Sequence, residues 1–177
     1  MTFPRTERGF TLLDVLIALV VLAFGMLALA RTISRSSQSE MEAFQRTQAM
    51  TLASELVDRI RNNPKNAAAY VGDYVAGGPI EDCTLLAATD IVGRDQCEMR
   101  NRLRGADILD ANKSVGAPIA ARACVMTPAA NIYVIAVAWQ GLLATAPADS
   151  PCGAGEFDRE ENRRVYSTVI QVATLGA

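Results

Sequence analysis

A nearly uninterrupted apolar segment close to the N-terminus constrains this chain more than any other feature. From Phe10 to Ala30 only Thr11, Asp14 and Gly25 interrupt the apolar residues, so 18 of 21 positions are apolar. A helix of this length spans about 32 Å, which matches the hydrocarbon thickness of a bilayer. The sequence therefore predicts a membrane-length helix over residues 10–30, attached to a domain of ordinary composition.

Three interpretations of this segment compete: a removed secretory signal, a plain membrane anchor, or an anchor with a second purpose. Arg5 and Arg8 before the segment, and Ala28-Leu29-Ala30 at its end, are typical of a secretory signal. However, the apolar run exceeds the usual length of about 7 to 15 residues, and it contains an acidic residue. These two features favour an anchor. Arginines flank the segment on both sides, so positive charge does not indicate its orientation.

Asp14 is the most informative residue of the segment, because an acidic group within a membrane is costly and usually functional. If the chain were cut before Phe10, the new α-ammonium would lie at position i−4 from this carboxylate, on the same helix face. The same ammonium could instead meet the Asp14 of a neighbouring subunit and set the register of helix packing. The alternative is an interfacial aspartate that reaches the lipid headgroups.

The residues RGFTLLDVL at positions 8–16 resemble the class III leader junction of type IV pilins and pseudopilins. This resemblance implies a leader over residues 1–9 and cleavage by prepilin peptidase between Gly9 and Phe10. It also implies N-methylation of Phe10. Asp14 stands where the family has glutamate, so the resemblance implies that it sets the assembly register with a carboxylate one methylene shorter.

The sequence after the apolar segment predicts that the helix continues over residues 31–63. No proline or glycine interrupts it before Pro64, and a helix from Phe10 to Arg61 would be about 78 Å long. An interrupted apolar stripe favours a helix packed under a sheet over a long coiled coil. The stripe comprises Met41, Phe44, Ala49, Leu52, Leu56 and Ile60, with Ala53 and Val57 alongside, and the expected solvated side comprises Arg46, Glu55, Asp58, Arg59 and Arg61.

Residues 64–177 are expected to form the globular domain, with a connecting region over 64–118 and a sheet with a loop over 119–177. The connecting region contains a Gly77-Gly78-Pro79 turn and a short helix from about Asp95 to Leu103. Branched and aromatic residues predict strands over 119–126, 132–140 and 164–174, a hairpin at 127–131 and a long loop over 141–163. The predicted fold class is therefore α+β: a long helix packed on an antiparallel sheet of three or four strands.

The four cysteines, Cys83, Cys97, Cys124 and Cys152, have spacings that match no zinc or redox motif. Of the three pairings, we favour Cys83 with Cys97 and Cys124 with Cys152, which close the connecting region and tie a strand to the long loop. Disulfides indicate an oxidising compartment.

The chain has no histidine, which excludes Ser-His-Asp and Cys-His catalysis. The sequence predicts no catalytic residue, no metal site and no cofactor.

The resemblance narrows in the second half of the chain. Four parts of the chain are similar to PilV-type minor pilins: Asp58-Arg59-Ile60-Arg61-Asn62-Asn63, the run from Tyr133 to Gly141, Cys152, and Arg163-Arg164-Val165. This implies a low-abundance subunit of a type IV pilus, in a priming or tip complex that supports assembly, twitching motility, adhesion or DNA uptake. The implied partners are prepilin peptidase, other minor and major pilins, and the inner-membrane assembly platform. The implied location is the bacterial inner membrane, and then the pilus, with the globular domain outside the cytoplasm.

Two other functions are weighed against this one. The first is a minor pseudopilin of a type II secretion system, whose leader would look alike. The second is a membrane-tethered periplasmic enzyme that uses Asp158 with Glu160 or Glu161, although a solvated charge cluster is the favoured interpretation of these residues. The arginines are scattered and form no DNA-binding stripe, so the sequence does not decide between binding and not binding nucleic acid. Trp139 is expected in the core rather than at an adhesive surface.

Overall fold

A computed structural model describes residues 11–106, 109–110, 113–114 and 116–173. The chain divides into two compact units, residues 1–41 and 42–177, and helix α1 (Leu12–Asn62) contributes to both. In the first unit, the large apolar side chains from Leu12 to Ile33 are 45–91% exposed. The predicted starting residue of the helix, Phe10, lies outside the described residues.

The second unit is an α+β domain, as predicted. Its main sheet is antiparallel and has four strands in the order β1-β4-β5-β6, and a separate short ladder joins β2 to β3. The strands are β1 (Gly72–Val75), β2 (Leu109–Asp110), β3 (Lys113–Ser114), β4 (Arg122–Ala129), β5 (Ile132–Gln140) and β6 (Arg163–Gln171). The helices are the second part of α1, α2 (Ile91–Leu103) and the 3-10 segments Pro64–Tyr70, Cys83–Leu85 and Glu160–Asn162.

The hairpin between β4 and β5 is tighter than the sequence predicts. The two strands are joined by Ala130 and Asn131 alone, and Asn131 has φ 59°, a left-handed conformation that asparagine tolerates. Pro128 lies inside β4, where the register shifts between Met126 and Ala129. A bulge is one of the few places where a strand accommodates proline, so reading it as a strand end was wrong.

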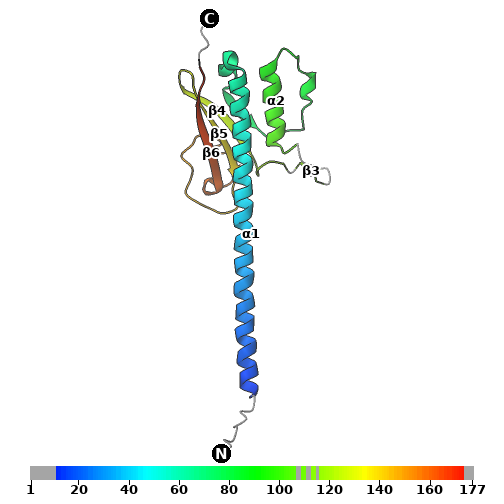
Figure 1. The fold of residues 1–177 in the computed structure, drawn as a ribbon, viewed down its shortest axis with the longest axis vertical. Coiled ribbons are helices and arrows are strands. Elements are labelled where there is room, and N and C mark those ends of the chain that lie inside the picture. The colour runs from blue at the N-terminus through cyan, green and yellow to red at the C-terminus, as the bar shows by residue number, and fades with distance from the viewer. Residues whose placement is uncertain (1–10, 107–108, 111–112, 115, 174–177) are drawn as a thin grey trace, which may run out of the picture. The chain divides into compact units, whose positions relative to one another are not determined.

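The core lies between the inner face of the sheet and the second part of α1, with α2 beside this part of α1 in Figure 1. Leu56 and Ile60 of α1 are fully buried, and so are Ile135 and Val137 of β5. Trp139 is buried, as expected. The full set of buried α1 residues is Gln45, Ala49, Leu52, Ala53, Leu56, Val57 and Ile60.

The predicted stripe of α1 was wrong at its first two positions. Met41 and Phe44 are 48% and 56% exposed, whereas Gln45 is buried. Gln45 lies four and seven residues before Ala49 and Leu52, so helix geometry places it on the core face whatever its polarity.

Helix α2 begins four residues earlier than Asp95, its predicted start. The Asp90 side chain caps the helix by accepting a hydrogen bond from the Gly93 N–H at 2.9 Å. A Cβ on Gly93 would lie 2.2 Å from the Asp90 carboxylate, so the cap depends on the glycine. This residue, which weakens the helical pattern in the sequence, is therefore part of the helix start.

The prediction that Glu55 and Arg59 lie on a solvated face was also wrong. Their side chains are 20% and 15% exposed, because α2 packs beside this part of α1. Arg59 contacts Asp95 and Glu98 of α2, and Arg102 of α2 contacts Glu55. The polar side of α1 therefore forms an interface between two helices.

Candidate functional site

Thr11 and Asp14 form a reciprocal hydrogen-bonded pair at the start of α1. Oδ2 of Asp14 accepts hydrogen bonds from the Thr11 N–H at 3.0 Å and from the Thr11 hydroxyl at 2.8 Å. The Thr11 hydroxyl in turn accepts from the Asp14 N–H at 3.3 Å. This is a capping box, in which residues three apart satisfy backbone donors at the helix start. Gly9 and Phe10, the predicted cleavage and methylation residues, lie outside the described residues.

The capping box uses only one oxygen of the Asp14 carboxylate. Oδ1 has no hydrogen-bond partner among the residues that the structure describes. An ionised carboxylate accepts at both oxygens, so Asp14 can cap its own helix and still accept from an ammonium. The sequence predicted the second task and missed Thr11, although a Thr three residues before an acidic residue signals such a cap.

The segment around this motif is long and apolar enough to cross a membrane. Its mean hydropathy reaches 2.8 over an 18-residue window, and none of that window is buried within the described structure. Thr32 donates a hydrogen bond to the Ala28 carbonyl, so the polar residue that follows the apolar run is satisfied within the helix. The segment thus has the properties of a membrane anchor.

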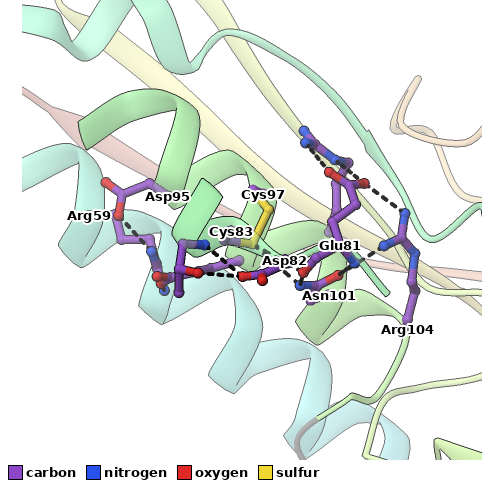
Figure 2. The surroundings of a disulfide bond; sticks show 11 residues. Arg59, Glu81, Asp82, Cys83, Asp95, Cys97, Asn101 and Arg104 are labelled. Carbon is purple, nitrogen blue, oxygen red and sulfur yellow. Dashed lines mark hydrogen bonds and ion pairs between the residues drawn. A yellow bond between two sulfur atoms is a disulfide. The ribbon is translucent and has the colours of Figure 1, made fainter. Parts of the chain in front are cut away.

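The disulfides join Cys83 to Cys97 and Cys124 to Cys152, the two pairs that the sequence favours. The first bond ties the 3-10 segment Cys83–Leu85 to α2, and Figure 2 shows it beside Glu81, Asn101 and Arg104. Hydrogen bonds from Arg100 and Arg104 lower the pKa of Glu81 to about 2. This part of the connecting region is therefore held by a covalent bond and by ion pairs.

The second disulfide holds residues 141–162 over the outer face of the sheet. Cys152 and Phe157 pack with Cys124, Ala136 and Ala138. Arg163 is buried and donates hydrogen bonds to the carbonyls of Ala148, Ser150 and Cys152. This role of Arg163 was not predicted from the sequence, because it depends on carbonyl groups that only the folded loop brings together.

The carboxylates weighed as an enzymatic pair have structural contacts. Glu160 pairs with Arg163 at 2.6 Å and accepts from the Gly155 N–H, and these contacts lower its pKa. Glu161 pairs with Arg159 at 3.2 Å on the surface. Asp158 has no such contact among the described residues. No group of three metal-ligating side chains occurs among them either.

The family model described as the prokaryotic N-terminal methylation motif matches residues 4–30. This match supports a type IV pilin-like prepilin or a pseudopilin. No curated protein and no solved structure matches the chain. The matched residues include the junction, Asp14 and the apolar run, and an apolar N-terminal helix fits the membrane anchor of such a prepilin-like protein.

Proposed function

We propose that this protein is a minor pilin of the type IV pilus, of the PilV type. Prepilin peptidase would cleave it between Gly9 and Phe10 and methylate Phe10, and the mature chain would join other pilins at the assembly platform in a priming or tip complex. The methylation motif at residues 4–30 is the observation that carries this proposal. The α+β domain behind a long helix supports it.

The apolar part of α1 would have two environments in succession, the inner membrane before assembly and neighbouring helices afterwards. Its exposed apolar side chains suit both, because lipid and packed helices are equally apolar. Packing between apolar helices alone would therefore not fix how far one helix is displaced along the axis of its neighbour. Asp14 would supply the specificity, since a carboxylate in an apolar contact is stable only where an ammonium meets it.

N-terminal mass analysis of the membrane-extracted chain, with and without prepilin peptidase in the cell, tests the processing step. We expect a mature chain that begins at N-methylated Phe10 only when the peptidase is present. A chain that begins at Arg31 would instead identify a secreted domain and refute the proposal. Recovery in sheared pili supports a pilin, whereas loss of protein secretion on deletion would identify a pseudopilin.

Two substitutions separate the capping and charge roles of Asp14. Asp14→Asn keeps an oxygen for Thr11 but removes the charge, and Thr11→Val removes the cap but keeps the charge. A hydrogen bond between charged groups contributes about 1.5 to 3 kcal/mol, so we expect Asp14→Asn to reduce incorporation into pili by about tenfold or more. Thr11→Val should reduce it less, and both variants should still be cleaved.

Quantitative immunoblots of sheared pili and of membranes measure this ratio. If Asp14→Asn is incorporated like the wild type, the charge does not set the register. If Thr11→Val is the more impaired variant, the role of Asp14 is confined to its own helix.

A further inference from the structure

Strand β6 is an edge of the main sheet, and its outer side carries unpaired backbone groups. At the two ends of its ladder with β5, the Gly141 N–H bonds the Asn162 carbonyl and the Val172 N–H bonds the Asn131 carbonyl. In an antiparallel ladder, successive residues point their backbone N–H and C=O groups to opposite sides of the strand. The two bonds therefore show that the backbone groups of the even-numbered residues of β6 point toward β5 and those of the odd-numbered residues point outward. The outward groups of Val165, Ser167, Val169 and Gln171 have no backbone partner among the described residues.

This edge lacks the devices that usually protect edge strands. From Val165 to Val172 the sequence VYSTVIQV contains no charge, no proline and no glycine, and Val169 is 63% exposed. The opposite edge, β1, has only four residues and includes Gly72 and Asp73. One edge of the sheet is therefore short and carries an aspartate, and the other is longer and has no charged residue after Arg164.

The outer face beside this edge is only partly covered by the loop of residues 141–162. A groove of about 480 Å³ lies where the cover of residues 141–162 ends, and Met126, Val134, Pro151 and Ser167 are among its lining residues. Val134 and Ser167 have their side chains on the same face of neighbouring strands. A strand added next to β6 would place alternate side chains beside this groove.

We propose that β6 accepts an additional strand from a different pilin-type subunit, which would extend the sheet by antiparallel pairing along residues 165–171. The edge chemistry selects an extended, uncharged segment rich in branched residues, because the backbone groups of β6 provide the hydrogen bonds and the exposed Val169 provides an apolar contact. The choice of a subunit as the occupant rests on the proposed function.

Strand direction favours a different subunit over a second copy. Antiparallel pairing of β6 with β6 of a second copy would turn that copy around, so that the two Glu42 ends would point in opposite directions. Two domains in the same orientation cannot form this antiparallel pair. In two domains with the same orientation, β6 of one can pair antiparallel with the edge strand of the other that corresponds to β1, because β1 and β6 run in opposite directions. The β1 edge of a second copy is too short to cover residues 165–171.

Site-specific photocrosslinking of the full chain in its own cells tests this interface. Benzoylphenylalanine replaces Val169 in one strain and Val75, a residue of the opposite edge that is 39% exposed, in a matched control. We expect the Val169 position to crosslink to an edge strand of a different subunit, about fivefold or more above the control. Links only to another copy of this chain, links only to helices, or a yield equal to the control would overturn the proposal.

A proline variant tests the hydrogen bonds themselves. Val169→Pro removes an outward N–H and leaves the ladder with β5 intact, whereas Val169→Thr keeps this N–H and a branched side chain. With the photocrosslinker at Ser167, we expect the proline variant to reduce the yield by about fivefold and the threonine variant to leave it nearly unchanged. Equal yields would refute strand pairing.

Two further measurements separate the causes of failure. The fluorescence of Trp139, the single tryptophan, shows in each variant whether the domain is folded. N-terminal mass analysis of the same cells reports processing at Phe10. Normal processing without a crosslink overturns the edge proposal, whereas a crosslinked chain that is never cleaved overturns the proposed function.

Discussion

Arg59 connects α1 to α2 through three carboxylates, and its removal gives the sharpest stability test in the domain. Its guanidinium lies 2.6 Å from Glu55, 2.6 Å from Asp95 and 2.9 Å from Glu98, and Figure 2 shows the contact with Asp95. Burial lowers the pKa of Arg59, but the hydrogen bonds that it donates to Glu55 and Glu98 raise the pKa by more, so the group stays charged. Tyr70 donates a hydrogen bond to the same Asp95 at 2.5 Å.

The size of the effect follows from what Arg59→Ala leaves behind. Glu55 and Asp95 are 20% and 19% exposed, so two carboxylates would remain largely desolvated. Glu55 would keep its ion pair with Arg102, and Asp95 would keep the hydrogen bond from Tyr70. Hydrogen bonds between charged groups contribute about 1.5 to 3 kcal/mol each, and these share one guanidinium, so they are not additive. Glu98 is 45% exposed and adds little. We expect a loss of about 2–4 kcal/mol, or about 6–12 °C in Tm.

The assay is urea and thermal unfolding of the full chain in detergent micelles, followed by the fluorescence of the buried Trp139. Arg61→Ala is the matched control, because Arg61 lies two residues away, is exposed and has no ion pair among the described residues. This control should change the free energy of unfolding by less than about 0.5 kcal/mol. If Arg59→Ala costs no more than Arg61→Ala, the network does not stabilise the domain and the reasoning from burial is wrong.

Two further predictions concern the disulfides and the acid side of the pH range. Replacing Cys124 and Cys152 with serine opens a loop of 28 residues and should cost about 3–4 kcal/mol. Limited proteolysis should then cleave within residues 141–162 of this variant but not of a Cys83→Ser/Cys97→Ser control; equal cleavage would contradict the tethering role. Glu81 has a folded pKa of about 2 against an ordinary 4.5, so its stabilisation is complete above about pH 4.5 and is lost as the pH falls toward 2. Because Glu81 is 39% exposed, the contribution is only about 0.5–1 kcal/mol, and Glu81→Gln should flatten the acid limb of unfolding by that amount.

The sequence predicts best the elements whose signal is local. Residues 132–140 match β5 at both ends, because branched and aromatic residues fill the strand without a break. β1 was not predicted, since four residues that begin with glycine carry too little pattern. β6 begins at Arg163, one residue before its predicted start, and ends at Gln171, three residues before its predicted end.

Side-chain roles that depend on a distant partner could not be predicted. Periodicity placed Arg59 on a polar face of α1, which is correct, but it cannot show that α2 presents carboxylates to that face. The same holds for Arg163, whose acceptors are carbonyl groups of a folded loop. In both cases the partners of the arginine lie in another segment, which only the folded chain brings close to it.

Asp14 shows how a prediction from sequence and a contact in the structure can both apply to one group. Cleavage before Phe10, as proposed, would place an ammonium at position i−4 from Asp14, and the structure shows a partner at i−3 in Thr11. Because Thr11 engages only Oδ2, the two partners do not compete for the same oxygen. The cap also reduces the cost of holding a carboxylate in an apolar helix before assembly, since part of its hydrogen-bonding capacity is already satisfied. In the proposed assembly, a short side chain held by its own helix would not extend toward a neighbour. The ammonium would then have to approach Asp14, and the register would depend on the position of the incoming N-terminus.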